Sequence, residues 1–90
     1  MLRVTEAGRV MANSVDFQSG LVETETRMRE EGTSDEIRFQ FVVYAIVKAL
    51  TETENMESDV DDFLRISQKH REEIDAIIGR CFDTSKNAFN

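Results

Sequence analysis

Apolar residues along this chain recur mostly at spacings of three and four, which is the period of a helix that buries one face. The clearest apolar run ends at Leu50 and covers most of the helical circumference, so we expect that helix to be buried on most sides. Thr33 and Glu36 have the spacing of a capping box, with Ser34 and Asp35 as competing caps. The pattern therefore predicts a helix that begins at this point and crosses the core.

A strand is the alternative for part of this run, because the segment FQFVVY alternates and is rich in strand-favouring residues. The length of the run and the capping box favour the helix. A helix would carry two apolar rows. The first row holds Ile37, Phe41, Tyr44 or Ala45, and Lys48, and the second holds Phe39, Val42, Val43, Ile46 and Leu50.

Two more helices are predicted towards the carboxyl end. Ser58 and Asp61 form a second capping box, which is followed by a short apolar face. Ser67 is placed to cap a further helix. The apolar face of the first holds Val60, Phe63 and Leu64, and the core row of the second holds Ile74, Ile77, Ile78 and Cys81. We expect the final residues, DTSKNAFN, to be frayed.

The first third of the chain has weaker signals. Apolar spacing predicts a helix over residues 5–19 that ends at Gly20. Residues 21–31 predict a short charged helix supported by acid-then-base pairs four residues apart, and Gly32 then breaks the chain. A mobile segment is the alternative for this charged helix.

Composition agrees with an all-α protein, because 90 residues form one domain at most and the chain has no proline and four glycines. We expect a small single domain, residues 1–90, of four or five short helices with its core in residues 33–84. The predicted core holds Phe41, Ala45, Val60, Leu64, Ile74 and Ile78.

Charge narrows the classes of partner. The net charge is −7, from 18 acidic and 11 basic residues. Direct nucleic-acid binding normally needs a basic face, so a basic protein surface is the more natural partner.

The longest apolar stretch, Phe41 to Val47, is too short to span a bilayer, and MLRVTEAGRV is not a signal peptide. Cys81 is the single cysteine, which fits a reducing cytoplasm.

No residue pattern predicts catalysis, a cofactor or a metal centre. Asp59, Asp61 and Asp62 suit a helix start rather than a calcium loop, since the glycine and glutamate of such a loop are absent. His70 and Glu73 could share a metal, but a lone histidine is more typical of a surface. We therefore expect a non-enzymatic protein.

A chain this small cannot bury all of its six phenylalanines and four methionines, so we expect an exposed apolar groove for a partner. The amino end is the expected location, because the carboxyl half is needed for the core. The candidate partner-binding residues are Val10, Met11, Phe17 and Met28.

The order of parts in the second half resembles the tail assembly chaperones of long-tailed bacteriophages. An apolar helix, an acidic turn, Asp-Val, an apolar pair, a serine and a helix with central isoleucines follow one another as in that family. The matching positions are Val43 to Leu50, Glu54, Met56, Asp59, Val60, Phe63, Leu64, Ser67, Ile74, Ile78 and Phe82. The chain departs from the family where the turn lacks its usual glycine and where Met56 replaces an aromatic residue.

The resemblance implies a helical cytoplasmic chaperone that binds the tape measure protein, helps recruit the tail-tube protein and is absent from the finished virion. We expect several copies along the client, which leaves a homo-oligomer open. A different class of function also fits the acidic composition. In that alternative the chain is a DNA mimic or inhibitor that occupies a basic nucleic-acid groove.

Overall fold

The computed structural model describes residues 2–53 and 60–88, with side chains as far as Phe82. It contains five helices and, within the described residues, no strand, which confirms the predicted all-α class. The strand alternative for FQFVVY is therefore wrong. The helices are α1 (Glu6–Ala12), α2 (Val15–Glu30), α3 (Asp35–Thr51), α4 (Val60–Lys69) and α5 (Arg71–Ala88).

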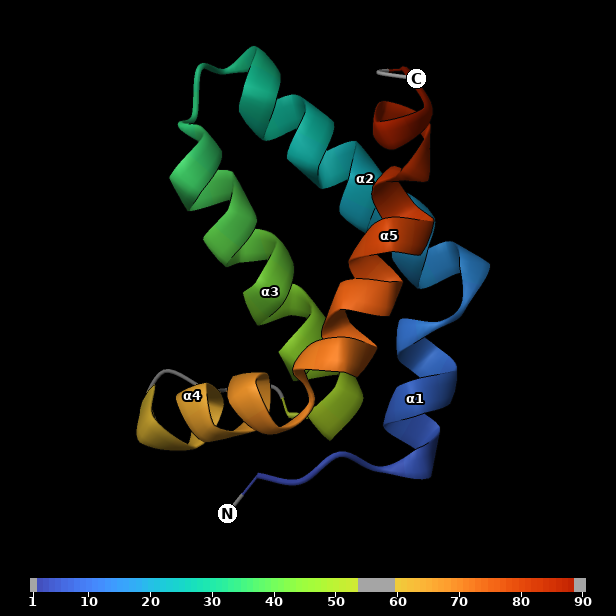
Figure 1. The fold of residues 1–90 in the computed structure, drawn as a ribbon, viewed down its shortest axis with the longest axis vertical. Helices are drawn as coiled ribbons and strands as arrows, with labels where there is room; N and C mark the ends of the chain where they lie inside the picture. The colour runs from blue at the N-terminus through green and yellow to red at the C-terminus, as the bar shows by residue number, and fades with distance from the viewer. Residues whose placement is uncertain (1, 54–59, 89–90) are drawn as a thin grey trace.

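Helix α3 is the centre of the arrangement, because it contacts each of the other four helices. Figure 1 shows α2 and α3 joined at one end of the molecule, α4 lying across the other end, and α5 running back along the middle. The molecule measures 39 × 24 × 21 Å along its principal axes. Coverage of α3 from several sides accounts for its nearly all-round apolar sequence.

Hydroxyl side chains cap the first three helices. Thr5, Ser14 and Ser34 accept hydrogen bonds from the backbone N–H groups three residues later. Such a bond satisfies one of the donors that a helix start leaves unpaired. Ser34, one of the predicted competing caps, therefore fixes the start of α3.

The predicted boundary between the first two helices is wrong. The break lies at Asn13 and Ser14, and α2 continues through Gly20 without interruption. A methyl group at Gly20 would meet no atom within 4 Å, so this glycine has open space and no close packing role. Its cost of about 1 kcal/mol relative to alanine is tolerated within a long helix, whereas the Ser14 cap creates a new start.

The predicted cap at Ser67 is also wrong. Ser67 lies inside α4, where its hydroxyl donates to the Phe63 carbonyl oxygen at 2.9 Å, and the chain turns at His70 instead. The predicted cap at Ser58 lies outside the described residues. Sequence spacing alone did not separate a serine that starts a helix from one that bonds back to the preceding turn.

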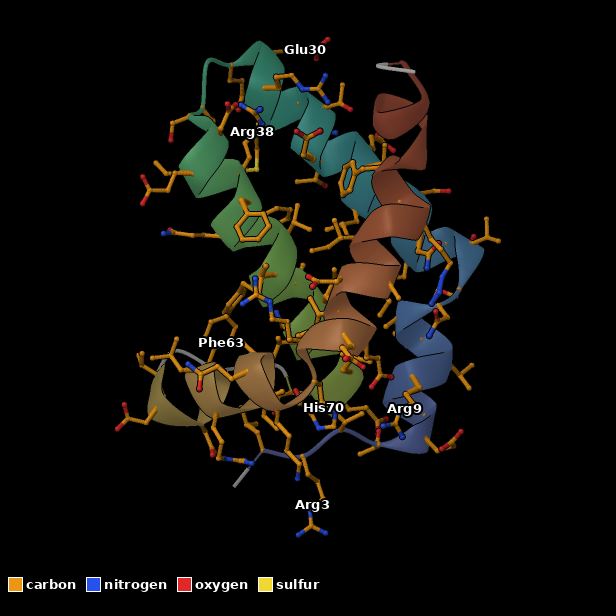
Figure 2. The ribbon with its side chains drawn as sticks, viewed as in Figure 1. Arg3, Arg9, Glu30, Arg38, Phe63 and His70 are labelled. Carbon is orange, nitrogen blue, oxygen red and sulfur yellow. The ribbon has the colours of Figure 1, made fainter. Side chains whose placement is uncertain are left out.

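The core is built from all five helices. It extends beyond residues 33–84, because Ala12 and Leu21 are buried within it. The half-buried Phe63 attaches α4 to α3, where its ring meets Tyr44 with centroids 6.0 Å apart (Figure 2). The buried apolar residues are Ala12, Leu21, Val42, Ile46, Val47, Leu50, Ile66, Ile74 and Ile77.

The prediction that Val60 and Leu64 of α4 belong to the core is wrong, since Val60 is 60% exposed and Leu64 is 49% exposed. The helix is rotated so that Phe63 and Ile66, three residues apart, face inward, and Ile66 is 1% exposed. Of the other predicted members, Ile74 is buried. Phe41, Ala45 and Ile78 are partly buried against the core.

Helix α1 docks closely on the end of α3. A Cβ atom on Gly8 would lie 2.0 Å from the Leu50 carbonyl oxygen, so only glycine permits this approach. The Thr5 N–H donates to the same oxygen at 3.1 Å, and the Thr5 hydroxyl donates to the Glu52 carboxylate at 2.6 Å. This contact fixes where α1 crosses α3 and so shapes the surface beside it.

Candidate functional site

An open groove lies between α1, α2 and α3, with a volume of about 550 Å³. Ala45 and Ala49, one turn apart on α3, form part of its wall, and their small side chains let another chain approach closely. Met11 of α1 and Phe17 of α2 line it with larger apolar groups. The full lining is Ala7, Met11, Phe17, Ala45, Lys48, Ala49, Glu52 and Thr53. We call it the Met11–Phe17 groove.

The local sequence explains how this groove is held open. Gly8 brings α1 against the end of α3, and the Ser14 cap starts α2 in a new direction two residues after α1 ends. Met11 is left 54% exposed at the corner, while Phe17 is half-buried against the core. The groove therefore combines a flexible, accessible thioether with a fixed aromatic ring, which suits an adaptable apolar contact.

The structure brings two of the four sequence-predicted partner residues together. Met11 and Phe17 both line the groove. Val10 is 69% exposed on α1 but does not line it, and Met28 is half-buried near the other end of α2. Binding by any of the four remains a prediction.

Sequence reasoning missed the alanines of the groove. Ala45 was assigned to the core, against which it does pack, but together with Ala49, four residues later, it also lines the groove. The same oblique row of α3 continues through Phe41 to Ile37, which is 53% exposed. An apolar row thus runs from the groove along α3.

Arginine pairs join α2 to α3 at the other end of these helices. The Glu25 carboxylate accepts from Arg29 at 2.6 Å and from Arg38 at 2.9 Å, and Arg38 also donates to the Thr33 carbonyl oxygen (Figure 2). Burial raises the pKa of Glu25, but the two guanidinium groups outweigh it and hold that pKa below its ordinary value of 4.5. Glu25 is therefore a structural carboxylate.

A second ionic cluster lies where α1 meets α5. Arg9 donates to the Glu73 carboxylate at 2.7 Å, and His70 lies 3.5 Å from the same side chain (Figure 2). Glu73 thus joins α5 to α1 through Arg9. Among the side chains that the structure describes, no group of three or more histidine, cysteine or acidic residues could hold a metal ion.

Asp62, one of the acidic residues at the start of α4, also has structural partners. Asp62 accepts from the Leu2 N–H at 2.7 Å and from Arg65, and Arg65 donates to the Leu2 carbonyl oxygen. The Leu2 bond, followed by the Arg65 bond, lowers the pKa of Asp62. Asp59 of the predicted carboxylate cluster lies outside the described residues.

Cys81 is half-buried against the core, and burial raises the pKa of its thiol. The thiol form is the less nucleophilic one, so this environment does not activate the sulfur.

Among the helices that the structure describes, none is both long and apolar enough to cross a membrane. Comparisons of the chain with protein-family models, curated proteins and solved structures find no match.

Proposed function

We propose that this protein is a non-enzymatic assembly chaperone that binds an amphipathic helix of a larger client. The observation that carries the proposal is the Met11–Phe17 groove, where an exposed methionine and a fixed phenylalanine flank the small side chains of α3. Helix-in-groove recognition uses an apolar groove of this kind to hold the apolar face of a partner helix.

The apolar row of α3 defines the length of client that would fit. Ile37 and Ala49 are twelve residues apart, which corresponds to about 18 Å along a helix axis. A client helix laid along this row would contribute a matching apolar stripe of about three turns. Many such short contacts, each weak, suit a long helical client that must later be released.

The resemblance of the second half to tail assembly chaperones supplies the identity of the client. We propose the tape measure protein as that client, with the tail-tube protein recruited to the complex. The chaperone would act in the host cytoplasm and be absent from the finished virion. An all-helical fold is consistent with this resemblance, and the net charge of −7 would keep the complex in solution.

The DNA-mimic alternative would require carboxylates that are free to imitate phosphates. Many acidic side chains of the described residues instead pair with arginines of the same chain. These include Glu6, Glu23, Glu25, Asp35, Asp62, Glu73 and Asp75. This pairing counts against the mimic for these seven side chains, and the chaperone is the function that we retain, because the Met11–Phe17 groove offers a client a defined apolar site.

Co-expression with the tape measure protein tests the proposal. The wild-type protein should keep that client in the soluble fraction, including in high salt, because apolar contacts persist when charges are screened. Met11→Asp should reduce the soluble client severalfold, since it places a charge in the groove. Val15→Asp is the matched control, because Val15 is 78% exposed and does not line the groove.

Two outcomes would contradict the proposal. The chaperone function fails if the client precipitates equally with and without this protein. The groove assignment fails if Met11→Asp and Val15→Asp behave alike. Binding to a basic DNA-binding protein that disappears in moderate salt would favour the mimic instead.

A further inference from the structure

Phe39 is exposed although it occupies a core-facing position of α3. It precedes Val42 by three residues and Ile46 by seven, so the three share one helical face. Val42 is 4% exposed and Ile46 is fully buried, whereas Phe39 is 58% exposed. The helices that close over Val42 and Ile46 therefore leave the first turns of this face uncovered.

Phe39 lines two hollows of similar size, about 190 and 200 Å³. Each exceeds the roughly 150 Å³ of an apolar cavity that accepts benzene, so each has room for a phenyl ring. The first is lined by Glu25, Asp35, Arg38, Phe39, Val42, Ile78 and Phe82, and the second by Phe39, Val43, Ser67, Gln68, Arg71, Ile74 and Asp75. We call this surface the Phe39 face.

The charged side chains of the Phe39 face are paired within the chain. Arg38 donates to Asp35 and to Glu25, and Arg71 lies 3.7 Å from Asp75. The face therefore presents arginines and carboxylates together, although the chain as a whole carries a charge of −7. A strongly basic partner would find no excess of unpaired acid here.

We propose that a second copy of this chain docks on the Phe39 face about a twofold axis. Each copy would insert its Phe39 ring into a hollow beside the Phe39 ring of the other. A twofold interface uses the same patch on both copies, so it requires a surface that is complementary to itself. A projecting ring next to a hollow of matching size meets that requirement.

The charge pattern favours a second copy over other occupants. Two chains of charge −7 repel one another, and a contact surface whose charges are close to balanced, as on the Phe39 face, adds least to that repulsion. A standard interface takes about 800 Å² per partner, roughly an eighth of the 6230 Å² surface of this chain. The Met11–Phe17 groove shares no lining residue with either hollow, so the dimer would carry two client sites.

Sedimentation equilibrium of the purified chain over a wide range of concentrations tests the proposal. The wild-type protein should show a monomer–dimer equilibrium. Phe39→Ala should raise the dimer dissociation constant about 30-fold or more, as expected for a central aromatic anchor. Val15→Ala is the matched control, because Val15 is 78% exposed and lines neither hollow nor the Met11–Phe17 groove.

Salt provides a second measurement. Added salt should tighten the dimer, because it screens the repulsion between two chains of like charge and leaves the apolar contact intact.

Circular dichroism should show equal helicity for the wild-type protein and the two variants. A chain that is monomeric throughout the range, or a dimer that Phe39→Ala does not weaken, would overturn the proposal. Loss of client binding by a monomeric Phe39→Ala variant would assign the face to the client instead.

Discussion

Gly8 is the residue on which the position of α1 depends most directly. Its Cα lies against the backbone of α3, and an added Cβ would come within 2.5 Å of the Leu50 carbonyl carbon. Backbone atoms cannot turn aside as a flexible side chain can, so a larger residue must push the two helices apart. The sequence showed only a glycine inside a helical pattern, which lowers helix propensity and does not reveal a helix–helix contact.

Gly8→Ala should therefore destabilise the protein, although alanine is the better helix former by about 1 kcal/mol. We expect a net loss of about 2 kcal/mol from overpacking, which corresponds to a fall of roughly 10 °C in Tm for a domain of this size. Gly20→Ala is the control in open space and should raise Tm slightly. Thermal unfolding that ranks the two variants in the opposite order would contradict the close approach.

The exposed and buried faces of α4 make a second comparison of single residues. Ile66→Ala should lower the free energy of unfolding by about 2–5 kcal/mol, because Ile66 is 1% exposed. Leu64→Ala should cost less than about 1 kcal/mol, because half of that side chain already meets solvent. Urea titrations of both variants measure these values. Equal losses would show that α4 is rotated differently.

At the scale of elements, the ion pair between Glu25 and Arg38 joins α2 to α3 near the turn between them. Glu25 of α2 is 8% exposed, and its carboxylate pairs with Arg29 of the same helix and with Arg38 of α3. A buried charge is stable only while it is paired and hydrogen-bonded. The sequence predicted Glu25–Arg29 as a pair within one helix, but the partnership with Arg38 depends on the tertiary fold.

This pair makes stability depend on pH in the acid range. The pKa of Glu25 is lowered by folding, so the unfolded chain takes up its proton first as pH falls through 4.5. The stabilisation is present above that pH and is lost progressively below it. Urea unfolding between neutral and acid pH should show this loss. The free energy of unfolding of Glu25→Gln should be lower than that of the wild type by about 1–3 kcal/mol at neutral pH. It should also fall less steeply as the pH is lowered.

Glu23→Gln provides the control for this element, because Glu23 lies in the same helix in an exposed pair with Arg27. Exposed pairs contribute between about 0 and 1 kcal/mol, so its unfolding should follow the wild type at every pH. An unchanged acid dependence in Glu25→Gln would assign the sensitivity to other carboxylates.

For the whole molecule, helical period and caps were sufficient to predict the fold class and the central position of α3. They could not predict where helices rotate or cross. Val60 and Leu64 fit an apolar face in sequence but point outward, and Phe39 shares a core row yet is exposed. Met11 and Phe17 line the same groove because the chain turns at Asn13 and Ser14, which sequence periodicity placed inside one helix.

The central position of α3 has a consequence for the order of events during synthesis. Its apolar surface is complete at Thr51, but α4 and α5, which cover part of it, finish only at Ala88. At roughly 5–20 residues per second, ribosomes take about 2–7 s to add the intervening chain. For that interval α3 can pair only with α1 and α2, so part of its apolar surface in the nascent chain stays uncovered and open to aggregation.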